Sequence, residues 1–272
     1  MNGSRIMMQK EQDKFTASNV FEGMTSISAL LNADYCNDRK IERIWIDQAK
    51  RHAKAREIGF LVAKSKERGF PIEYVTTEQI EAIAVGNTHG GILAFCSDRA
   101  IPALTLEAIA PDRFFVYLEG IEDPYNFGYT LRSLYAAGVH GVILPPRNWM
   151  SAAGVVARAS AGASELIPMY TADADDCANL FHKAGYRILC AGIRDSVSVF
   201  DESFPYPILL VVGGEKRGIS RNLLKKADAI VRIDYGREFR GSLSAASAAT
   251  VMAFEIFRQN RTPQKAKNTN ND

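Results

Sequence analysis

The chain has 272 residues, of which 47% are hydrophobic and 24% are charged, and its formal net charge is +2. This composition is typical of a globular protein and excludes the fibrous and disordered classes, and the small net charge excludes a uniformly basic binder. No apolar run is long enough to predict a membrane helix. The four scattered cysteines form no Cys-x-x-Cys pair. They therefore predict neither a zinc site nor a disulfide framework, and they favour a cytoplasmic location.

The first 96 residues predict a polar arm followed by a small domain. Residues 1–14 lack an apolar stretch, which indicates a flexible arm rather than a secretory signal. The patterns that follow predict helices at 26–31, 49–68 and from 77, and strands at 41–46, 72–75 and 91–95. This order predicts a small α/β sandwich over residues 15–96. Residues 97–112, with two prolines and no strand pattern, are interpreted as a linker.

From residue 113 the pattern of strands and helices starts again. Apolar strands are predicted at 114–118, 142–144, 166–169, 188–191, 208–212 and 230–233. Helices are predicted at 127–137, 151–161, 175–184, 220–226 and 243–259. Continuous apolar strands that alternate with helices predict a parallel sheet covered on both faces, here spanning residues 113–260. The polar residues 261–272 predict a disordered tail.

In such a sheet, ligands bind beyond the carboxyl ends of the strands, so the segments after the strands deserve most notice. The first candidate loop follows the strand at 114–118 and leads to Asn126 and Arg132. Asn126 is a candidate N-cap for the next helix. Arg132 lies six residues further on, about 240° away around a helix, so the two side chains do not share a face. A capping residue followed by a surface arginine is the alternative interpretation.

Two further loops combine glycines or small residues with polar groups. Gly213, Gly214 and Gly218 follow an apolar strand and permit a tight turn with close approach of a ligand. Their spacing matches neither a P-loop nor a dinucleotide-binding motif. Glu215 between them is either a solvated turn residue or a carboxylate at a ligand pocket. In the third loop, Ser242 is a candidate N-cap, and the small residues after it allow close packing. The four histidines show no metal-ligand spacing, so no metal is expected.

Together and in this order, the three loops resemble the motifs of the SpoU-type family of S-adenosylmethionine-dependent RNA methyltransferases, in the SPOUT class. Residues 123–128, Asp-Pro-Tyr-Asn-Phe-Gly, with Arg132 resemble the first motif, Asn-x-Gly-x-x-x-Arg. Residues 213–218, Gly-Gly-Glu-Lys-Arg-Gly, resemble the second motif, Gly-x-Glu-x-x-Gly. Ser242-Leu243-Ser244 stands where the third motif usually has Ser-Leu-Asn. Residues 158–163, Arg-Ala-Ser-Ala-Gly-Ala, also resemble a recurrent family segment.

The segment before the linker resembles a ribosomal-protein-like RNA-binding domain that often precedes this methyltransferase domain. The resemblance rests on the order of its elements and on its ending, Thr88-His89-Gly90-Gly91-Ile92. Residues 39–68 contain ten Lys or Arg and four Asp or Glu, a net charge of +6. A local field of this sign attracts phosphates. The alternative interpretation is an ordinary solvated helix face.

The resemblance implies methyl transfer from S-adenosylmethionine to a ribose 2′-hydroxyl, with ribosomal RNA favoured over transfer RNA. It assigns Arg132 to a phosphate contact and to stabilisation of the developing alkoxide, and Asn126 to orientation of the ribose or phosphate. Glu215 would hold the second loop, and Ser242 and Ser244 the third. The cofactor would lie against four residues, which are Val212, Gly213, Ile233 and Leu243. A trefoil knot and a homodimer with the site at its interface are also implied.

Two alternatives remain open at this stage. Ser244 replaces an asparagine, and a hydroxyl lacks the separate acceptor and paired donors of an amide. A SPOUT-like RNA-binding protein with impaired catalysis is therefore the first alternative. The second is a nucleotide-binding α/β enzyme of another class. The sequence disfavours it, because the signatures of a phosphate loop and of a ribose-binding acid are absent.

Overall fold

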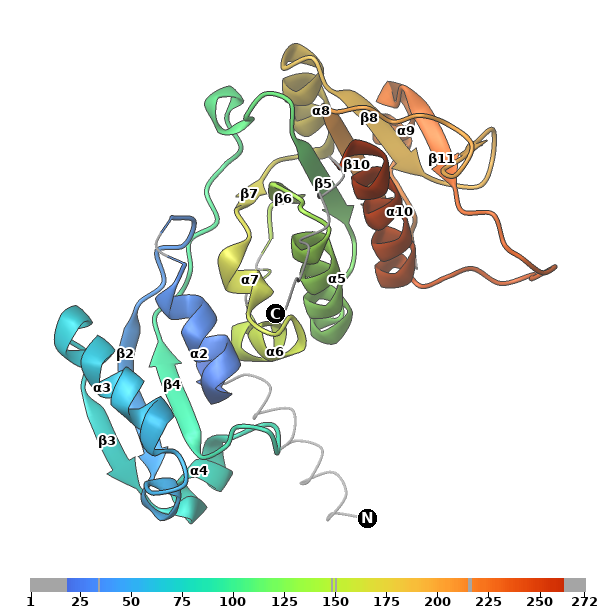
Figure 1. Cartoon of the computed structure of the whole chain (residues 1–272). Helices are drawn as coiled ribbons and strands as arrows, with labels where there is room; N and C mark the ends of the chain where they lie inside the picture. The colour runs from blue at the N-terminus through green and yellow to red at the C-terminus, as the bar shows by residue number, and fades with distance from the viewer. Residues whose placement is uncertain (1–18, 34, 148, 150, 215–216, 262–272) are drawn as a thin grey trace, which may run out of the picture.

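The computed structural model describes residues 19–33, 35–147, 149, 151–214 and 217–261. The predicted arm at 1–14 and all of the predicted tail except residue 261 lie outside these ranges. Two sheets of four and seven strands form the N-terminal and C-terminal domains, which are joined through residues 97–112 (Figure 1). Among the described residues, none of the helices is long and apolar enough to cross a bilayer.

The N-terminal domain is built on a mixed sheet in the order β1-β4-β2-β3. Its strands are β1 (Val20–Glu22), β2 (Ile41–Asp47), β3 (Ile72–Val75) and β4 (Ile92–Cys96). Its helices are α2 (Gly23–Leu31), α3 (Ala55–Arg68), α4 (Thr77–Ile83) and the short 3-10 helix η1 (Gln48–Lys50). Strand β4 pairs antiparallel with β1 and β2, whereas β2 and β3 are parallel. The predicted α/β order is therefore confirmed for this domain.

Local sequence explains where two of these helices begin. We expected one helix from residue 49, but Asp47 accepts a hydrogen bond from the backbone N–H of Ala49 and caps η1 instead. The α-helix α3 therefore begins only at Ala55. Helix α4 begins after a capping box, in which the Thr76 side chain accepts from Gln79 N and the Gln79 side chain accepts from Thr76 N.

The C-terminal domain has a parallel sheet in the order β7-β6-β5-β10-β8-β11-β9. Its strands are β5 (Phe114–Glu119), β6 (Gly141–Leu144), β7 (Met169–Thr171), β8 (Arg187–Ala191), β9 (Val197–Ser198), β10 (Ile208–Gly213) and β11 (Ala229–Arg232). Its helices are α5 (Pro124–Ala136), α6 (Ala153–Ala159), α7 (Ala163–Leu166), α8 (Ala174–Lys183), α9 (Arg221–Lys226) and α10 (Ala245–Asn260). Residues 97–112 contain the 3-10 helix η2 (Leu106–Ala108).

Helices cover both faces of this sheet, as predicted from its continuous apolar strands. Phe114, Val116 and Leu118 of β5 pack with residues of α5 and α10 in one core cluster. The intervening residues Phe115 and Tyr117 belong to a second cluster with residues of α8 and α9. Successive side chains of a strand point to opposite faces, so each of these strands needs apolar residues throughout.

Three local expectations differ from the structure. The helix predicted at 151–161 is the shorter α6, and the strand predicted at 166–169 begins only at Met169. Part of the difference is the short helix α7, which follows Gly162 in a left-handed conformation at φ 84°. Strands β1 and β9 were not predicted, because three and two residues are too short to show a period.

The two domains meet at a domain boundary formed by α6 and α7 on one side and by β1 and α2 on the other. Ala153 and Ala157 of α6 belong to the core cluster of the N-terminal domain. Close packing is also visible at Gly162, where an added Cβ would lie 2.4 Å from Cβ of Ala29. The family-like segment 158–163 therefore lies at the domain boundary.

A buried charge cluster completes this boundary. The Arg39 guanidinium forms an ion pair of 3.1 Å with Glu165, and both side chains are fully buried. Arg99, from the residues interpreted as a linker, donates to the carbonyl oxygens of Ser164, Cys36 and Ile167. Burial lowers the pKa of Arg99, an effect that the nearby Glu165 carboxylate partly offsets. Segment 97–112 is thus packed against both domains.

Candidate active site

The first two candidate loops lie side by side because their strands are neighbours. Strands β5 and β10 pair in parallel with Glu119 opposite Gly213, so both loops leave the same edge of the sheet. Gly214 N donates to the Glu119 carbonyl at 2.6 Å. An added Cβ at Gly214 would lie 2.2 Å from the carbonyl oxygen of Gly120. Only residues without side chains at these positions allow the two loops to approach so closely.

Asp123, not Asn126, caps the helix of the first motif, so our assignment of the cap to Asn126 was wrong. The Asp123 carboxylate accepts a hydrogen bond from Asn126 N at 2.8 Å, and Pro124 begins α5. A proline at the first helical position is favourable because its missing N–H has no partner there. The side chain of Asn126 is therefore available for another role, from the first turn of α5.

The first motif meets the start of α10, directly after the third motif, at a small pocket of about 130 Å³. Asn126 lines it together with Ala245 and Ala246 at the start of α10. The remaining lining residues, Gly120, Ile121, Glu122 and Asp123, come from the loop after β5. The titratable groups of this lining are thus the exposed carboxylates of Glu122 and Asp123. Both residues lie in the first candidate loop, but we assigned no role to them from the sequence.

Arg132 does not reach this pocket within its own chain. It lies almost two turns after Asn126 on α5, and its side chain is exposed. Within the described part of the chain, it forms no hydrogen bond or ion pair. The expectation that Asn126 and Arg132 lie on different helix faces agrees with this arrangement. The Arg132 guanidinium is therefore free to bind a group that comes from outside the chain.

The second motif forms a cradle made mainly of backbone. Val212 is buried at the end of β10, and a Cβ at Gly213 would lie 2.3 Å from the carbonyl carbon of Gly218. The Ser220 hydroxyl is buried and has no hydrogen-bond partner among the described residues. An unpaired buried polar atom beside exposed backbone groups suits a polar ligand that accepts and donates hydrogen bonds. Glu215 falls outside the described residues, so its predicted role stays a prediction.

In the third motif, Ser244 rather than Ser242 is the N-cap, which corrects our prediction. The Ser244 hydroxyl accepts from Ser247 N at 3.2 Å, and α10 begins at Ala245. Ser242 is exposed in the preceding loop. Since serine is among the best capping residues, the serine at position 244 stabilises the start of α10 directly.

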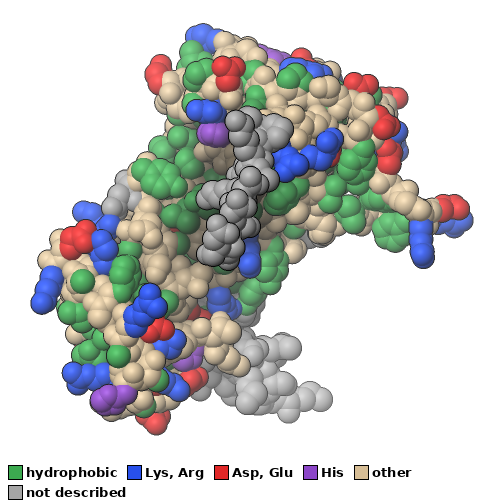
Figure 2. All heavy atoms as spheres, in the orientation of Figure 1, with side chains coloured by type: hydrophobic (Ala, Val, Ile, Leu, Met, Phe, Trp, Pro, Cys, Tyr) green, Lys and Arg blue, Asp and Glu red, His purple; other side chains and the backbone are tan. Residues whose placement is uncertain are grey.

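The predicted cofactor residues divide into two sets. Val212 lies in the core cluster next to α10, and Ile233 packs against the same cluster. Leu243 is 37% exposed, and its backbone N–H donates to the Tyr235 hydroxyl at 3.1 Å. The loop between β11 and α10, which carries Leu243, extends away from the body of the domain (Figures 1 and 2). The structure thus brings Val212, Gly213 and Ile233 to one region, and Leu243 lies on the projecting loop.

Burial changes the pKa of two groups in the sheet, on the face that α8 and α9 cover. It raises the pKa of the Cys190 thiol in β8 to about 12, and it also raises the pKa of Tyr117 in β5. Both groups are therefore protonated near neutral pH and serve as core packing. Among the described residues, no group of three or more His, Cys, Asp or Glu could hold a metal ion.

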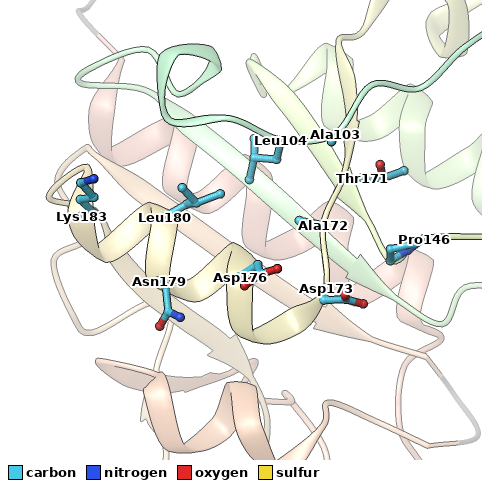
Figure 3. Close-up of a pocket in the computed structure, with 10 residues that line it drawn as sticks. All are labelled: Ala103, Leu104, Pro146, Thr171, Ala172, Asp173, Asp176, Asn179, Leu180 and Lys183. Atoms are coloured by element: carbon cyan, nitrogen blue, oxygen red, sulfur yellow. The ribbon is translucent and has the colours of Figure 1, made fainter.

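A larger pocket of about 440 Å³ lies elsewhere, beside the edge strand β7 (Figure 3). Asp173, Asp176 and Lys183 line it with Leu104 from the segment between the domains. None of the residues that we selected from the sequence belongs to its lining. The mixed charges show no preference for one ligand, so the pocket lined by Asn126 and the start of α10 is the better candidate for an active site.

Comparison with known proteins agrees with the motif resemblance. Residues 113–254 match the family model described as SpoU rRNA Methylase family. Residues 20–101 match the model described as RNA 2′-O ribose methyltransferase substrate binding. The putative TrmH family tRNA/rRNA methyltransferase YacO of Bacillus subtilis is 26% identical over 232 residues, which are 82% of this chain and 90% of the relative.

A second relative and one solved structure show the same similarity over most of the chain. The 23S rRNA (guanosine-2′-O-)-methyltransferase RlmB of Burkholderia is 27% identical, over 88% of this chain and 96% of the relative. A crystal structure of an AdoMet-bound rRNA methyltransferase from Sinorhizobium meliloti superposes with a TM-score of 0.75 at 23% identity, covering 93% of this chain and 95% of that one. At this identity the superposition shows the fold. Because the SpoU model spans more than half of the chain, the protein belongs to the SpoU rRNA methylase family and is an RNA methyltransferase.

Proposed function

We propose that the protein transfers a methyl group from S-adenosylmethionine to a ribose 2′-hydroxyl, with ribosomal RNA as its substrate. The observation that carries the proposal is the pocket where Asn126 of the first motif meets the start of α10, on a chain of the SpoU family. The relative RlmB, whose name specifies guanosine 2′-O-methylation of 23S rRNA, supports both the ribose position and the substrate class. So does the match of residues 20–101 to a 2′-O-methyltransferase substrate-binding model.

The cradle of the second motif fits the methyl donor. Val212 and Gly213 would face it with Ile233, and the unpaired Ser220 hydroxyl and neighbouring backbone groups would bind its polar atoms. When bound, S-adenosylmethionine supplies a methyl group on a positively charged sulfur, which leaves as a neutral thioether. We propose the same role for Leu243, and we retain Glu215 as the residue that holds the second loop. The trefoil knot expected for this region also stays a prediction.

The residues of the first motif would position the acceptor. From its place in the pocket, the Asn126 amide can both donate to and accept from the ribose or its phosphate. The exposed Arg132 guanidinium suits a phosphate, because its planar donors match two phosphate oxygens. Arginine remains protonated in proteins, so its contribution is stabilisation of negative charge as the hydroxyl loses its proton. Ser242 and Ser244 would order the loop before α10.

We also propose that the protein acts as a homodimer through the C-terminal domain. Tyr129 and Tyr135 on α5 and Phe254 on α10 are each more than 40% exposed, and the two helices pack against one another. Exposed aromatic residues on two helices that pack together favour a protein interface. The small residues at the start of α10 pack in part within their own chain, since Ala249 is buried there. A second copy on this face would lie next to Arg132 and would help to enclose the site.

The N-terminal domain would hold the RNA. Lys50, Arg51 and His52 are exposed, and Gly90 and Gly91 lie beside Lys54 and Lys50. Lys and Arg side chains recur over this domain on the face drawn in Figure 2. Contacts of this kind bind phosphates without reading the base sequence, and they weaken as salt increases.

The test is a map of ribose methylation in total RNA from cells with and without the gene. We expect one ribosomal RNA position to lose its 2′-O-methyl group, and purified protein with S-adenosylmethionine to restore it. Modification confined to transfer RNA would overturn the substrate. RNA and cofactor binding without any transfer would instead support a catalytically impaired RNA-binding protein. Calorimetry that shows no binding at millimolar cofactor would contradict the cofactor site.

A further inference from the structure

Arg158 contacts both domains, and its partner in the C-terminal domain is the neighbour of Asn126. It lies near the end of α6, and its Nη1 forms an ion pair of 3.0 Å with Oε2 of Glu22 in β1. Its Nη2 donates to the Tyr125 hydroxyl at 3.2 Å. Tyr125 lies in the first turn of α5, between Pro124 and Asn126. One guanidinium therefore contacts both the N-terminal domain and the first motif.

On the N-terminal side, the same contact holds the start of the loop 85–91. The Glu22 side chain is only 5% exposed, and its carboxylate accepts hydrogen bonds from the backbone N–H groups of Val85 at 2.5 Å and Gly86 at 3.1 Å. An added Cβ at Gly86 would lie 1.7 Å from Nη1 of Arg158. Glycine at this position therefore allows the guanidinium to approach the loop backbone.

The other end of this loop lies within the basic surface. An added Cβ at Gly90 would lie 3.7 Å from Cε of Lys54, and one at Gly91 would lie 2.9 Å from Cγ of Lys50. Asn87, Thr88 and Gly90 are exposed. A continuous set of contacts thus runs from the basic surface through the loop 85–91, Glu22 and Arg158 to Tyr125.

We propose that Arg158 is a positioning residue for methyl transfer, acting through Tyr125 and Glu22. It fixes the distance between the surface that holds the RNA and the pocket that contains Asn126. The target nucleotide, and not one of its neighbours, then places its ribose in that pocket. This inference rests on the proposed function. Displacements of about 1 Å away from the reacting atoms can lower the rate by about 100-fold, so a residue of this kind has a measurable effect.

The charge cluster of Arg39, Glu165 and Arg99 provides the comparison. It also crosses the domain boundary, but its hydrogen-bond partners belong to α7 and its flanks and to residues 19, 36, 37 and 97 rather than to the first motif. It is fully buried at Arg39 and Glu165, whereas the Arg158 side chain is 21% exposed. We therefore infer that the buried cluster holds the two domains together and that Arg158 positions the RNA-holding surface relative to the pocket.

The test uses the full chain with two variants at the contact between Arg158 and Tyr125. Tyr125→Phe removes only the hydroxyl that accepts from Arg158, and Arg158→Lys keeps the charge but lacks the fork that reaches two partners. Ribosomal RNA from a strain that lacks the gene serves as the substrate. We expect each variant to lower kcat/KM for the RNA about tenfold or more and to increase methylation at neighbouring nucleotides, which mass spectrometry of RNA fragments detects.

A merely structural role predicts a different pattern. It would lower the Tm and weaken binding of S-adenosylmethionine, whereas we expect both to stay at their wild-type values. Because both substitutions act on the same contact between Arg158 and Tyr125, the double variant should lose no more activity than the more affected single variant. Wild-type kinetics and site selection in both variants would overturn the inference while the proposed function stood. Absence of transfer by the wild-type protein would overturn both.

Discussion

The two domains present their candidate functional groups in different ways. In the C-terminal domain, these groups lie where parallel strands end, and glycines bring the loops within a few ångströms of each other. In the N-terminal domain, exposed Lys50 and Arg51 side chains lie on the surface next to a loop. Single changes should therefore have severe effects in the first region and graded effects in the second.

The largest effect is expected for Arg132→Ala, which should lower methyl transfer about 100- to 1,000-fold. Cofactor affinity should stay near its wild-type value, because Arg132 lies away from the second-motif cradle and is predicted to contact the RNA. Arg132→Lys should also be strongly impaired, since lysine lacks the bidentate geometry. Single-turnover assays and calorimetry measure the two effects separately.

Arg187→Ala is the matched control. Arg187 lies at the start of β8, at the amino ends of the parallel strands, whereas the candidate loops follow their carboxyl ends. It should retain full transfer activity. Near wild-type turnover of Arg132→Ala would show that the motif resemblance describes the fold alone and not the chemistry.

The next largest effect is expected at the domain boundary, where Glu165→Gln leaves Arg39 and Arg99 buried without a countercharge. Removal of one partner from a buried pair typically costs about 3–5 kcal/mol. Denaturant unfolding should show a loss in this range. Glu57→Gln removes a partly exposed carboxylate paired with Lys54 and should change stability far less. Equal stability of both variants would mean that the buried cluster does not hold the domains together.

Gly214→Ala should have a smaller effect on stability and a specific effect on the cofactor. The new Cβ would lie 2.2 Å from a backbone oxygen, which cannot rotate away. Overpacking of this kind costs about 1–3 kcal/mol, and we expect at least a tenfold weaker affinity for S-adenosylmethionine.

The matched control is Gly59→Ala on α3, where no atom lies within 4 Å of the new Cβ. This variant should fold with equal or greater stability, because alanine favours helix. If Gly214→Ala binds the cofactor as the wild type does, the close approach of the two loops does not shape the cradle.

The smallest effect is expected for the double substitution Lys50→Ala and Arg51→Ala, which should weaken RNA binding severalfold without changing cofactor affinity. The slope of log affinity against log salt should fall by about 2, because two phosphate contacts are lost. Lys64→Ala with Lys66→Ala removes equal charge near the end of α3, roughly 15 Å from the start of that helix, and is the control. Equal losses in both double variants would indicate a diffuse basic field rather than a defined surface.

The sequence alone determined the features that depend on local patterns. Apolar runs predicted the parallel sheet, because strands covered on both faces need apolar residues throughout. The order of the three motifs predicted the family, which the match over residues 113–254 confirmed. Single residues were harder to assign. Asp123 and Asn126 are both suitable caps, and so are Ser242 and Ser244, and only the helix starts at Pro124 and Ala245 decide between them.

Which distant segments meet depends on the packing of the folded chain. The neighbouring β5 and β10 are about ninety residues apart in the chain, and their pairing places Gly120 against Gly214. Likewise, a half-buried arginine at position 158 has no local signal that points to Glu22 or Tyr125. The spacing of apolar residues along a helix or strand shows which of its faces is buried. It does not show which other element covers that face, because this depends on the packing of the whole chain.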